Sequence, residues 1–255
     1  MKKIFLIGFF LLSACSSLPE GQRGTPGAIP VLDVTPTRFI PTPVNATVPP
    51  TDVPSPVPTP TPLPPERYFT EDFNSKLDYW STLFASGDSS EVGILNDNGM
   101  LTFDFNSPNS WLYAIYGAFN YESVHIETRV EMQGSNLNAI GLVCNYDEQE
   151  GWYEFNISSD GSYNLLHGQW LADEIARYTP ILNATSEYIE TGNSANEIGL
   201  DCYENIVQLY VNGKVIRKMD VAHIGLTGGK VGLSIASFEE VPVIVSFDWV
   251  KVSKP

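Results

Sequence analysis

Basic residues and histidine are scarce in this chain. Its 255 residues include 14 Lys and Arg against 30 Asp and Glu, which gives a formal net charge of −16 at pH 7. A surface of that charge repels phosphate backbones and anionic lipid headgroups, so we expect no nucleic-acid partner. Neutral glycans, cations and basic proteins remain open as partners. The three histidines, His125, His167 and His223, are scattered, and no spacing of Cys and His suggests a zinc site.

Several catalytic motifs are also missing. The sequence contains no P-loop, no dinucleotide-binding fingerprint, no Gly-x-Ser-x-Gly elbow and no His-Glu-x-x-His. These absences argue against nucleotide-dependent enzymes, serine hydrolases of the elbow type and zinc peptidases. The apolar run at residues 4–12 is only about nine residues long, whereas a membrane-spanning helix needs about 20.

That short apolar run is part of a secretory signal. Lys2 and Lys3 precede it, and Leu12-Ser13-Ala14-Cys15 follows it, so residues 1–14 have the layout of a signal peptide with a small residue at the cleavage site. The tetrapeptide resembles the bacterial lipobox, which implies cleavage before Cys15 and lipid on its thiol and new amino terminus. We therefore expect an exported protein that is anchored to the bacterial cell envelope by acyl chains and touches the membrane only through them.

Proline is concentrated behind the cysteine. Residues 16–66 hold 15 of the 19 prolines, many of them in Thr-Pro or Pro-x-Pro steps. Proline fixes φ and has no N–H, so neither a helix nor a sheet ladder propagates through such a segment. We predict that residues 15–66 are a disordered Pro/Thr-rich tether. The alternative is a ligand segment for small proline-recognition domains.

Residues 67–255 read as one all-β domain. Only Pro108, Pro180 and Pro242 interrupt it before the last residue, and apolar and polar residues alternate along many segments. Such period-two alternation is typical of strands with one buried face. We expect about a dozen strands in an antiparallel two-sheet sandwich. The predicted strands are at 91–95, 99–105, 111–116, 124–132, 140–146, 152–158, 162–167, 198–203, 207–211, 230–236 and 243–252, with a return strand from 215.

Turn residues support this interpretation. Asn212-Gly213 follows an apolar strand and precedes Val215, and Asp160-Gly161 separates two further strands, so both dipeptides predict hairpins. Residues 171–178 are the one segment that we expect to be helical.

The domain also resembles the concanavalin A-like jelly rolls. The matching segments, which cover nearly all of 67–255, are Phe69-Thr70-Glu71-Asp72-Phe73 with Trp80, Trp152-Tyr153-Glu154-Phe155-Asn156-Ile157-Ser158, Asn196-Glu197-Ile198, Leu209-Tyr210-Val211-Asn212-Gly213, Val231-Gly232-Leu233 and Phe247-Asp248-Trp249-Val250-Lys251-Val252. The resemblance implies a jelly roll whose concave sheet is often used for carbohydrate. Some relatives are laminarinase-type glucanases, and others hydrolyse 3-keto-glycosides.

Two cysteines remain after Cys15. Cys144 and Cys202 both point to the apolar side of their strands, and they form an even pair in an exported protein. We expect a disulfide between them. The alternative is two separate buried thiols that behave as small apolar side chains.

Aromatic and polar side chains on the opposite strand faces suggest sugar binding. Sugar rings stack on aromatic side chains, and sugar hydroxyls need paired donors and acceptors. The candidate binding residues are Trp152, Glu154, Asn156, Asn145, Arg129, Glu127, Tyr203 and Tyr210. Trp152 is the foremost of these, because an outward-facing Trp exposes apolar area unless a ligand covers it. The alternative is an ordinary solvated sheet face.

Cleavage of glycosides is less well supported. A retaining hydrolase needs two carboxylates about 5.5 Å apart, but Glu127 and Glu131 are four residues apart on one strand, which corresponds to about 13 Å. Laminarinase-type glucanases carry Glu-x-Asp-x-x-Glu, and the segment from His125 to Glu131 lacks this motif, with Arg129 where the Asp would fall. A cross-strand ladder of ion pairs explains these charges more simply.

Calcium is the one cofactor that we consider. Ca²⁺ takes oxygen ligands, and Glu71 or Asp72 in the first strand could meet Asp248 in the last strand. The alternative is that Asp248 caps a turn or pairs with Lys251.

The sequence therefore predicts a monomeric, envelope-anchored lipoprotein whose jelly roll binds a glycan without cleaving it. The first alternative is an enzyme of the 3-keto-glycoside hydrolase type, for which Glu127, Arg129 and Glu154 would have to meet in one cleft with shifted pKa values. The second is an adhesion module that binds other envelope proteins.

Overall fold

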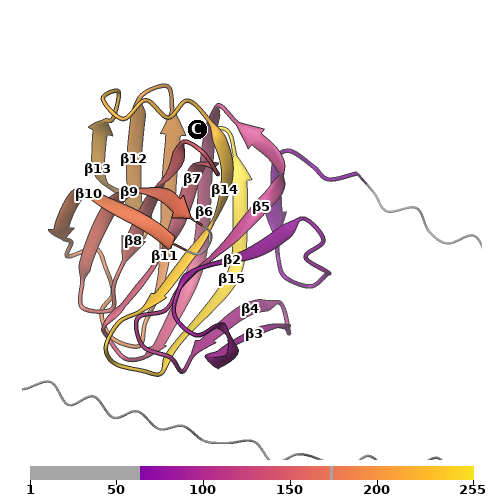
Figure 1. Ribbon diagram of the computed structural model, residues 1–255, viewed down its shortest axis with the longest axis vertical. Helices are drawn as coiled ribbons and strands as arrows, with labels where there is room; N and C mark the ends of the chain where they lie inside the picture. The colour runs from indigo at the N-terminus through magenta and orange to yellow at the C-terminus, as the bar shows by residue number, and fades with distance from the viewer. Residues whose placement is uncertain (1–63, 173–174) are drawn as a thin grey trace, which may run out of the picture. The chain divides into compact units, whose positions relative to one another are not determined.

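The computed structural model describes residues 64–172 and 175–255. The predicted signal peptide, the lipidation site Cys15 and nearly all of the tether lie outside these residues. Within the described part of the chain, no helix has the length and apolar character needed to cross a membrane. The first described residues, from 64, lead into a domain built almost entirely of β-strands (Figure 1).

The strands form two antiparallel sheets. An eight-stranded sheet has the order β13-β12-β11-β6-β15-β4-β3, with β1 paired to β15. Its strands are β1 (Phe69–Glu71), β3 (Val92–Asp97), β4 (Met100–Phe105), β6 (Ser123–Gly134), β11 (Ala195–Tyr203), β12 (Ile206–Val211), β13 (Lys214–Asp220) and β15 (Val243–Ser253).

The second sheet has seven strands in the order β10-β9-β8-β7-β14-β5-β2. They are β2 (Trp80–Ser86), β5 (Trp111–Tyr121), β7 (Asn138–Asp147), β8 (Gly151–Ile157), β9 (Ser162–Ala172), β10 (Ile175–Thr185) and β14 (Gly229–Ser237). The one helical turn in the described residues is a 3₁₀ turn at Ser89–Glu91. The predicted all-β, two-sheet sandwich is confirmed.

The main core lies between the two sheets. On β6, Val124, Ile126 and Val130 are fully buried, while the intervening residues face outward as the alternation predicts. Thr128, which lies between Ile126 and Val130, is also buried. Its hydroxyl donates to the carbonyl of Trp249 on the neighbouring strand at 2.5 Å. A buried hydroxyl costs little when it is hydrogen bonded in this way.

A second apolar cluster covers the other face of the seven-stranded sheet. Its buried members are Ala85, Tyr113, Ile115, Val143, Tyr146 and Trp152. Because this sheet is covered on both faces, every residue of β8 is buried. A strand is usually buried on both faces where other elements cover the sheet. Here the side chains that cover β8 come from other strands of the same sheet.

The prediction of a helix at residues 171–178 is wrong. Residues up to Ala172 continue β9, and β10 begins at Ile175. The physical reason is packing: Ala176 and Tyr178, two residues apart, both face the second apolar cluster. Burial of alternate residues needs the period of a strand, and it outweighs the modest helix propensity of the segment.

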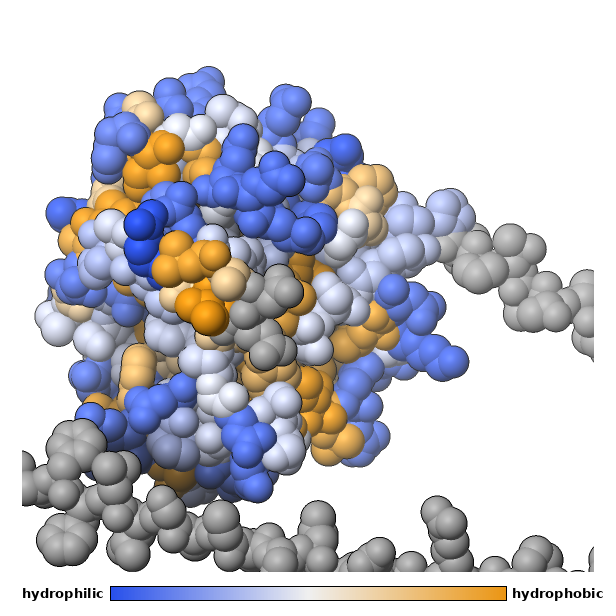
Figure 2. All heavy atoms as spheres, in the orientation of Figure 1, coloured by the Kyte–Doolittle hydropathy of each residue, from blue (hydrophilic) through white to orange (hydrophobic). Residues whose placement is uncertain are grey.

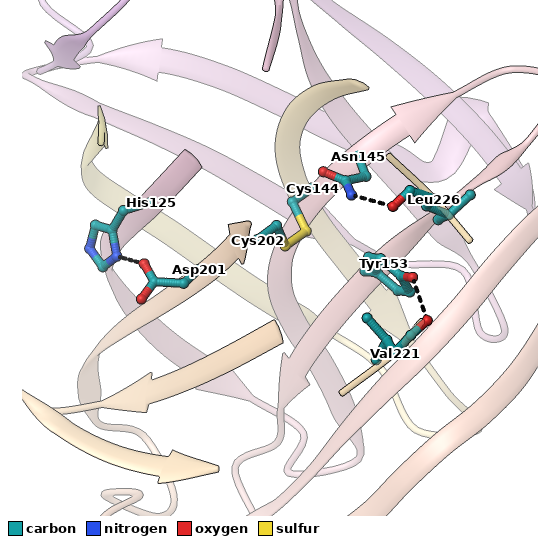
Figure 3. Close-up of a disulfide and its surroundings, with 8 residues drawn as sticks. All are labelled: His125, Cys144, Asn145, Tyr153, Asp201, Cys202, Val221 and Leu226. Atoms are coloured by element: carbon teal, nitrogen blue, oxygen red, sulfur yellow. Dashed lines mark hydrogen bonds and ion pairs between the residues drawn. A yellow bond between two sulfur atoms is a disulfide. The ribbon is translucent and has the colours of Figure 1, made fainter. Parts of the chain in front are cut away.

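A disulfide joins the two sheets. Cys144 on β7 and Cys202 on β11 are bonded, with their Cα atoms 6.5 Å apart and both side chains buried in the core. Figure 3 shows the bond in the space between the strands, with the pair formed by His125 and Asp201 on the far side of β11. The predicted disulfide is confirmed.

Candidate functional site

The seven-stranded sheet curls around its outer face. Its two edge strands, β2 and β10, lie at opposite ends of the strand order, yet they approach each other (Figure 1). Trp111 on β5 stacks on Tyr178 of β10, with ring centroids 4.5 Å apart and an interplanar angle of 18°. This stack bridges the sheet from one side to the other, so the face between the edge strands is concave and its middle is filled.

The side chain of Glu154 lies at the centre of this concave face and is fully buried. Its Oε2 atom accepts hydrogen bonds from the Tyr113 hydroxyl at 2.7 Å and from Trp152 Nε1 at 3.2 Å. Its Oε1 atom accepts from Trp111 Nε1 at 3.1 Å, from Asn156 Nδ2 at 2.9 Å and from the Ser234 hydroxyl. Five donors on one carboxyl group replace its lost hydration, which is what a buried carboxylate requires.

Aromatic rings enclose that carboxyl group. Tyr113 contacts Trp152 edge to face, with centroids 5.3 Å apart, and its hydroxyl hydrogen bonds to that of Tyr178 at 2.9 Å. Burial, followed by the charge of Glu154, raises the pKa of both Tyr113 and Tyr178. Both hydroxyls therefore stay protonated at neutral pH and keep their hydrogen bonds. We call Glu154 with Trp111, Tyr113, Trp152 and Tyr178 the Glu154 cage.

The expectation that Trp152 presents an open ring is wrong. Trp152, Glu154 and Asn156 do share one face of β8, as the alternation predicts, but each is 0% exposed. The rings that cover Trp152 lie on other strands: Trp170, Tyr113 and Tyr146 have centroids 5.1, 5.3 and 5.5 Å from that of Trp152, and Tyr178 lies at 6.4 Å. Asn145 is also buried, at a break in the β7–β8 register, where its Nδ2 donates to the carbonyl of Leu226 at 3.4 Å (Figure 3).

An open hollow of about 650 Å³ lies beside the cage, near the end of β9. Half-buried Trp170 lines it, and the Nε1 atom of this residue donates to the Tyr146 hydroxyl at 2.9 Å. Leu171, 61% exposed, adds apolar surface. The remaining lining residues are Thr82, Leu83, Phe84, Tyr146, Glu148 and Ala172. We call this space the aromatic hollow. Its volume is within the range of small-ligand sites.

The surface around the sheets is mixed in character. Figure 2 shows apolar residues in separate patches within a largely hydrophilic face. A smaller space of about 180 Å³ opens at the other end of β9, and Ser162, Asn164 and Asn156 line it. We call it the polar pocket. The concave face thus offers two openings, each lined by both apolar and polar residues, with the Glu154 cage between them.

The other predicted binding residues are on the eight-stranded sheet. Glu127 and Arg129 are on β6, Tyr203 ends β11 and Tyr210 is on β12, so these four residues do not share a sheet with Trp152, Glu154 and Asn156. The candidate side chains of β8 and those of β6, β11 and β12 point away from the core on opposite sides of the sandwich. The strand alternation could assign each side chain to a face, but it could not say which strands share a sheet.

A hydrogen-bonded network organises the outer face of the eight-stranded sheet. Asp201, 4% exposed, accepts from the Tyr210 hydroxyl at 2.6 Å, and its Oδ1 atom lies 2.6 Å from His125 Nδ1. The hydrogen bond to Asp201 raises the pKa of His125. Burial, with Asp201, raises the pKa of Tyr210 to about 12. Gln208 Nε2 donates to the Tyr210 hydroxyl.

Ion pairs extend this network across strands. Lys251 donates to Glu127 at 2.7 Å, and Arg129 lies 3.9 Å from Glu197 and 3.7 Å from Asp248. The predicted ladder of cross-strand pairs is therefore present, although Glu131 is not the partner of Arg129. Tyr203 lines a hollow of about 560 Å³ on this face, and the amine of Lys218 lies 5.6 Å from its ring centroid.

The predicted calcium ligands do not converge. β1 does pair with β15, but Glu71 caps the backbone N–H of Phe73 at 3.1 Å, and Asp72 caps that of Asn74 at 3.2 Å. Asp248 faces Arg129. Within residues 64–172 and 175–255, no group of three or more His, Cys, Asp or Glu side chains could hold a metal ion. The calcium site stays an untested prediction that these contacts do not support.

Sequence reasoning missed several residues of the concave face. Trp111, Tyr113 and Ile115 alternate along β5 and all face the second apolar cluster. This run of large side chains on the supposedly outward face was the available signal that the sheet is covered on both sides. For Trp170 and Tyr178 the helix expected over 171–178 concealed the alternation.

The chain matches no family model and no curated protein. Solved structures with a similar fold are found, however. The Bacillus licheniformis beta-glucanase is 14% identical, with a TM-score of 0.52 over 74% of this chain and 98% of that one. The laminarinase catalytic domain from Thermotoga maritima is 11% identical, with a TM-score of 0.51 over 74% and 99%. A glycoside hydrolase family 16 endo-glucanase from Bacteroides ovatus is 12% identical, with a TM-score of 0.50 over 72% and 99%. At these identities the likeness shows a shared concanavalin A-like jelly-roll fold.

Proposed function

We propose that this protein binds a neutral glycan without cleaving it and that the aromatic hollow holds the ligand. The observation that carries the proposal is the half-buried ring of Trp170 at the wall of an open space of about 650 Å³. Polar groups for sugar hydroxyls stand next to it, namely Thr82, the Tyr146 hydroxyl and the carboxylate of Glu148. An aromatic platform with a few polar groups is the combination that sugar rings require.

The names of the similar structures agree with this class of ligand. All three proteins reported above are named as glucan-active enzymes, two of them glucanases and one a laminarinase, and they share this fold over almost their full length. Folds host many functions, so the likeness favours a glycan ligand in general terms, and the aromatic hollow supports it in this chain.

The carboxylates of the concave face favour binding over hydrolysis. The described strands of this sheet carry two acidic residues, Glu154 and Asp147, and Glu148, which directly follows β7, is the single carboxyl group among the described lining residues of the aromatic hollow. Glu154 is buried under five donors, and Asp147 accepts the backbone N–H groups of Gln149 and Glu150 at 2.8 and 3.0 Å. A glycosidase needs an accessible pair of carboxyl groups on either side of the bond to be cleaved.

The arrangement also weakens the alternative of a 3-keto-glycoside hydrolase. That alternative requires Glu127, Arg129 and Glu154 to meet in one cleft. Glu154 faces outward from the seven-stranded sheet, whereas Glu127 and Arg129 face outward from the eight-stranded sheet. The main core separates them, so no single cleft contains all three.

We extend the proposal to the cellular setting: acyl chains on Cys15 anchor the protein in the bacterial envelope, and the Pro-rich segment holds the jelly roll away from the membrane. The support is the order of Lys2, Lys3, the apolar run and Cys15. Globomycin blocks the peptidase that cleaves lipoprotein signals, so treated cells should accumulate the uncleaved chain. Normal processing in treated cells would contradict the anchor.

A glycan array tests the binding function. The full chain in detergent is applied beside Trp170→Ala and the matched control Trp249→Ala, which removes a half-buried Trp from the other sheet. We expect the wild type and Trp249→Ala to bind the same neutral glycans and Trp170→Ala to lose them. Wild-type binding that survives Trp170→Ala would move the site elsewhere, and a silent array would reject the proposal.

A further inference from the structure

The alternation of side chains along β7 reverses near the end of the strand. Leu142 and Cys144 face the main core, and Val143 faces the concave side of the sheet, as a regular strand requires. Tyr146, two residues after Cys144, should therefore face the core as well. It belongs instead to the second apolar cluster on the concave side. The period of two is thus broken between Cys144 and Tyr146.

A bulge at Asn145 is the cause of this reversal. On β8, Tyr153 pairs with Cys144. The next pair is Asp147 with Gly151, so β7 has one residue more than β8 between the two pairs. Asn145 has a φ of 50°, in the left-handed region that asparagine adopts more readily than most residues. An extra residue in one strand of an antiparallel pair re-aims the side chains that follow it.

The neighbouring strand β14 accommodates the bulge with a glycine. The pairing of β14 with β7 shifts at the same place, between Lys230 and Gly232. A Cβ atom on Gly229 would lie 2.5 Å from the carbonyl carbon of Asn145 and 2.6 Å from the carbonyl oxygen of Tyr146. Both distances are too short for a van der Waals contact, so any other residue would collide with the bulge. Both neighbours of β7 therefore fit the reversed orientation of Tyr146.

The reversal brings Tyr146 to the wall of the aromatic hollow. Its hydroxyl accepts the Nε1 hydrogen of Trp170 at 2.9 Å, and its ring centroid lies 5.5 Å from that of Trp152. Burial raises the pKa of Tyr146, so the hydroxyl stays neutral near pH 7. This hydrogen bond ties one edge of the Trp170 ring to the sheet.

The other contacts of Trp170 restrain its ring less. Its centroid lies 5.1 Å from that of Trp152 at an interplanar angle of 44°, and 6.3 Å from that of Tyr113 at 83°. Ring contacts tolerate a range of angles, whereas an N–H···O hydrogen bond has a strongly preferred direction. The backbone beside Trp170 is irregular too, because its pairing partner Ala176 lies at a register shift. The hydrogen bond to Tyr146 is therefore the directional restraint on the Trp170 ring.

We propose that Tyr146 is a positioning residue for glycan binding: its hydroxyl holds the Trp170 ring in the orientation on which a sugar ring stacks. Beyond offering a polar group to the sugar, Tyr146 thus acts through Trp170. A ring that is already ordered loses less conformational freedom when the ligand binds. This inference rests on the proposed function, because it concerns the same hollow and the same class of ligand.

The test uses Tyr146→Phe, which keeps the ring and removes the hydroxyl. The matched control is Tyr121→Phe, because Tyr121 is also buried, its hydroxyl donates to the carbonyl of Arg67 at 2.7 Å, and it does not line the hollow. NMR of the free full chain in detergent measures hydrogen exchange of the Trp170 indole N–H, whose signal is identified by its loss in Trp170→Ala. Calorimetric titration with cello-, laminari-, xylo- and mannohexaose then measures affinity.

We expect two changes in Tyr146→Phe: the Trp170 indole N–H exchanges at least fivefold faster, and the affinity for the best probe falls about fivefold. Tyr121→Phe should change neither. Unchanged indole exchange would overturn the proposal, since a loss of affinity would then come from direct contact with the sugar alone. Faster exchange with wild-type affinity would overturn it as well.

The proposed function can be judged separately. If Trp170→Ala abolishes binding while Tyr146→Phe binds as the wild type does, the proposed function stands and the positioning role fails. If no hexasaccharide binds the wild type, the proposed function fails, and the contact between Tyr146 and Trp170 is structural only.

Discussion

Glu154 is the residue on which the concave face depends. Five donors, from β5, β14 and its own strand β8, converge on one carboxyl group with no exposed surface. Trp111, Tyr113 and Trp152 all take their orientation from this group. The carboxyl group therefore works as an internal template for the aromatic rings rather than as a reagent.

Replacing Glu154 by Gln should destabilise the domain by about 2–4 kcal/mol, because an amide accepts through one oxygen only and its NH₂ group faces indole and phenol donors. Urea denaturation measures the change. Glu148→Gln is the control, since the side chain of Glu148 is 73% exposed and its replacement should change stability little. Equal stability of the two variants would contradict the role of Glu154.

His125 should make stability depend on pH. The hydrogen bond that His125 donates to Asp201 raises the pKa of the histidine, so protonated His125 favours the folded state. Its contribution is complete below the unfolded pKa of about 6.5 and is lost as pH rises through the higher folded pKa. The stability difference between the wild type and His125→Gln should therefore shrink from pH 6 to pH 9 in urea titrations. A difference that is constant or grows with pH would contradict this assignment.

At the residue scale, the sequence predicted on which face of a strand a side chain lies, but it did not predict whether that face is exposed to solvent. Alternation correctly placed Trp152, Glu154 and Asn156 together on one side of β8. Whether that side is open depends on rings from other strands, of which Trp170 and Tyr113 lie nearest to Trp152 and are about 20 and 40 residues away along the chain. Neither their pairing nor the curl of the sheet is encoded locally, so the prediction of an exposed Trp152 failed.

At the scale of secondary-structure elements, β10 is the strand that closes the concave face. It is an edge strand that pairs only with β9, and its register shifts twice, between Ile175 and Ala176 and between Pro180 and Leu182. Pro180 also lacks a backbone N–H. Tyr178 gives this irregular strand its firmest attachment, through the stack on Trp111 and the hydrogen bond to Tyr113.

Tyr178→Ala should therefore loosen β10 selectively. We expect amide hydrogen exchange in β10 to accelerate at least tenfold, which corresponds to a local loss of about 1.4 kcal/mol, while β7 and β14 keep their protection. Tyr188→Ala serves as the control because Tyr188 is 44% exposed and lies outside the cage. Unchanged exchange in β10 would show that its backbone pairing alone holds it.

Most strands could be predicted because one of their faces meets the main core. β6, β11 and β12 alternate regularly, and Asn212-Gly213 marks the β12–β13 hairpin with positive φ at both residues. β1, with three residues, is too short to show a period. β2 and β10 were missed because they are edge strands in which Ala85 is the one buried residue and the others are half-buried or exposed, so their alternation is weak.

At the largest scale that the structure describes, residues 64–172 and 175–255 form two sheets that are held together by apolar burial and one disulfide. The Cys144–Cys202 bond joins the sheets across 58 residues of sequence, and removing it should cost about 4 kcal/mol in the chain-entropy account. The double variant Cys144→Ala, Cys202→Ala should unfold at correspondingly lower urea concentration. Reduction of the wild-type disulfide should reproduce most of this loss in unfolding free energy. A double variant as stable as the oxidised wild type would contradict a stabilising role for the disulfide.

The sandwich as a whole was predictable because many short alternating strands with tight turns have few other ways to bury their apolar faces. The division of strands between sheets was not, because it is decided by contacts far apart in sequence. That division separates the two sets of candidate binding residues, with Trp152 and Glu154 on one sheet and Glu127 and Arg129 on the other.

One measurement tests both that the protein binds a glycan and that it leaves the glycan uncleaved. The full chain is incubated separately with cello-, laminari-, xylo- and mannohexaose. Mass spectrometry of the bound and free fractions then records how much of each sugar is retained and how long the retained sugar is. The account predicts a retained, intact hexasaccharide for the wild type and none for Trp170→Ala. Shortened products, or retention that does not depend on Trp170, would contradict it.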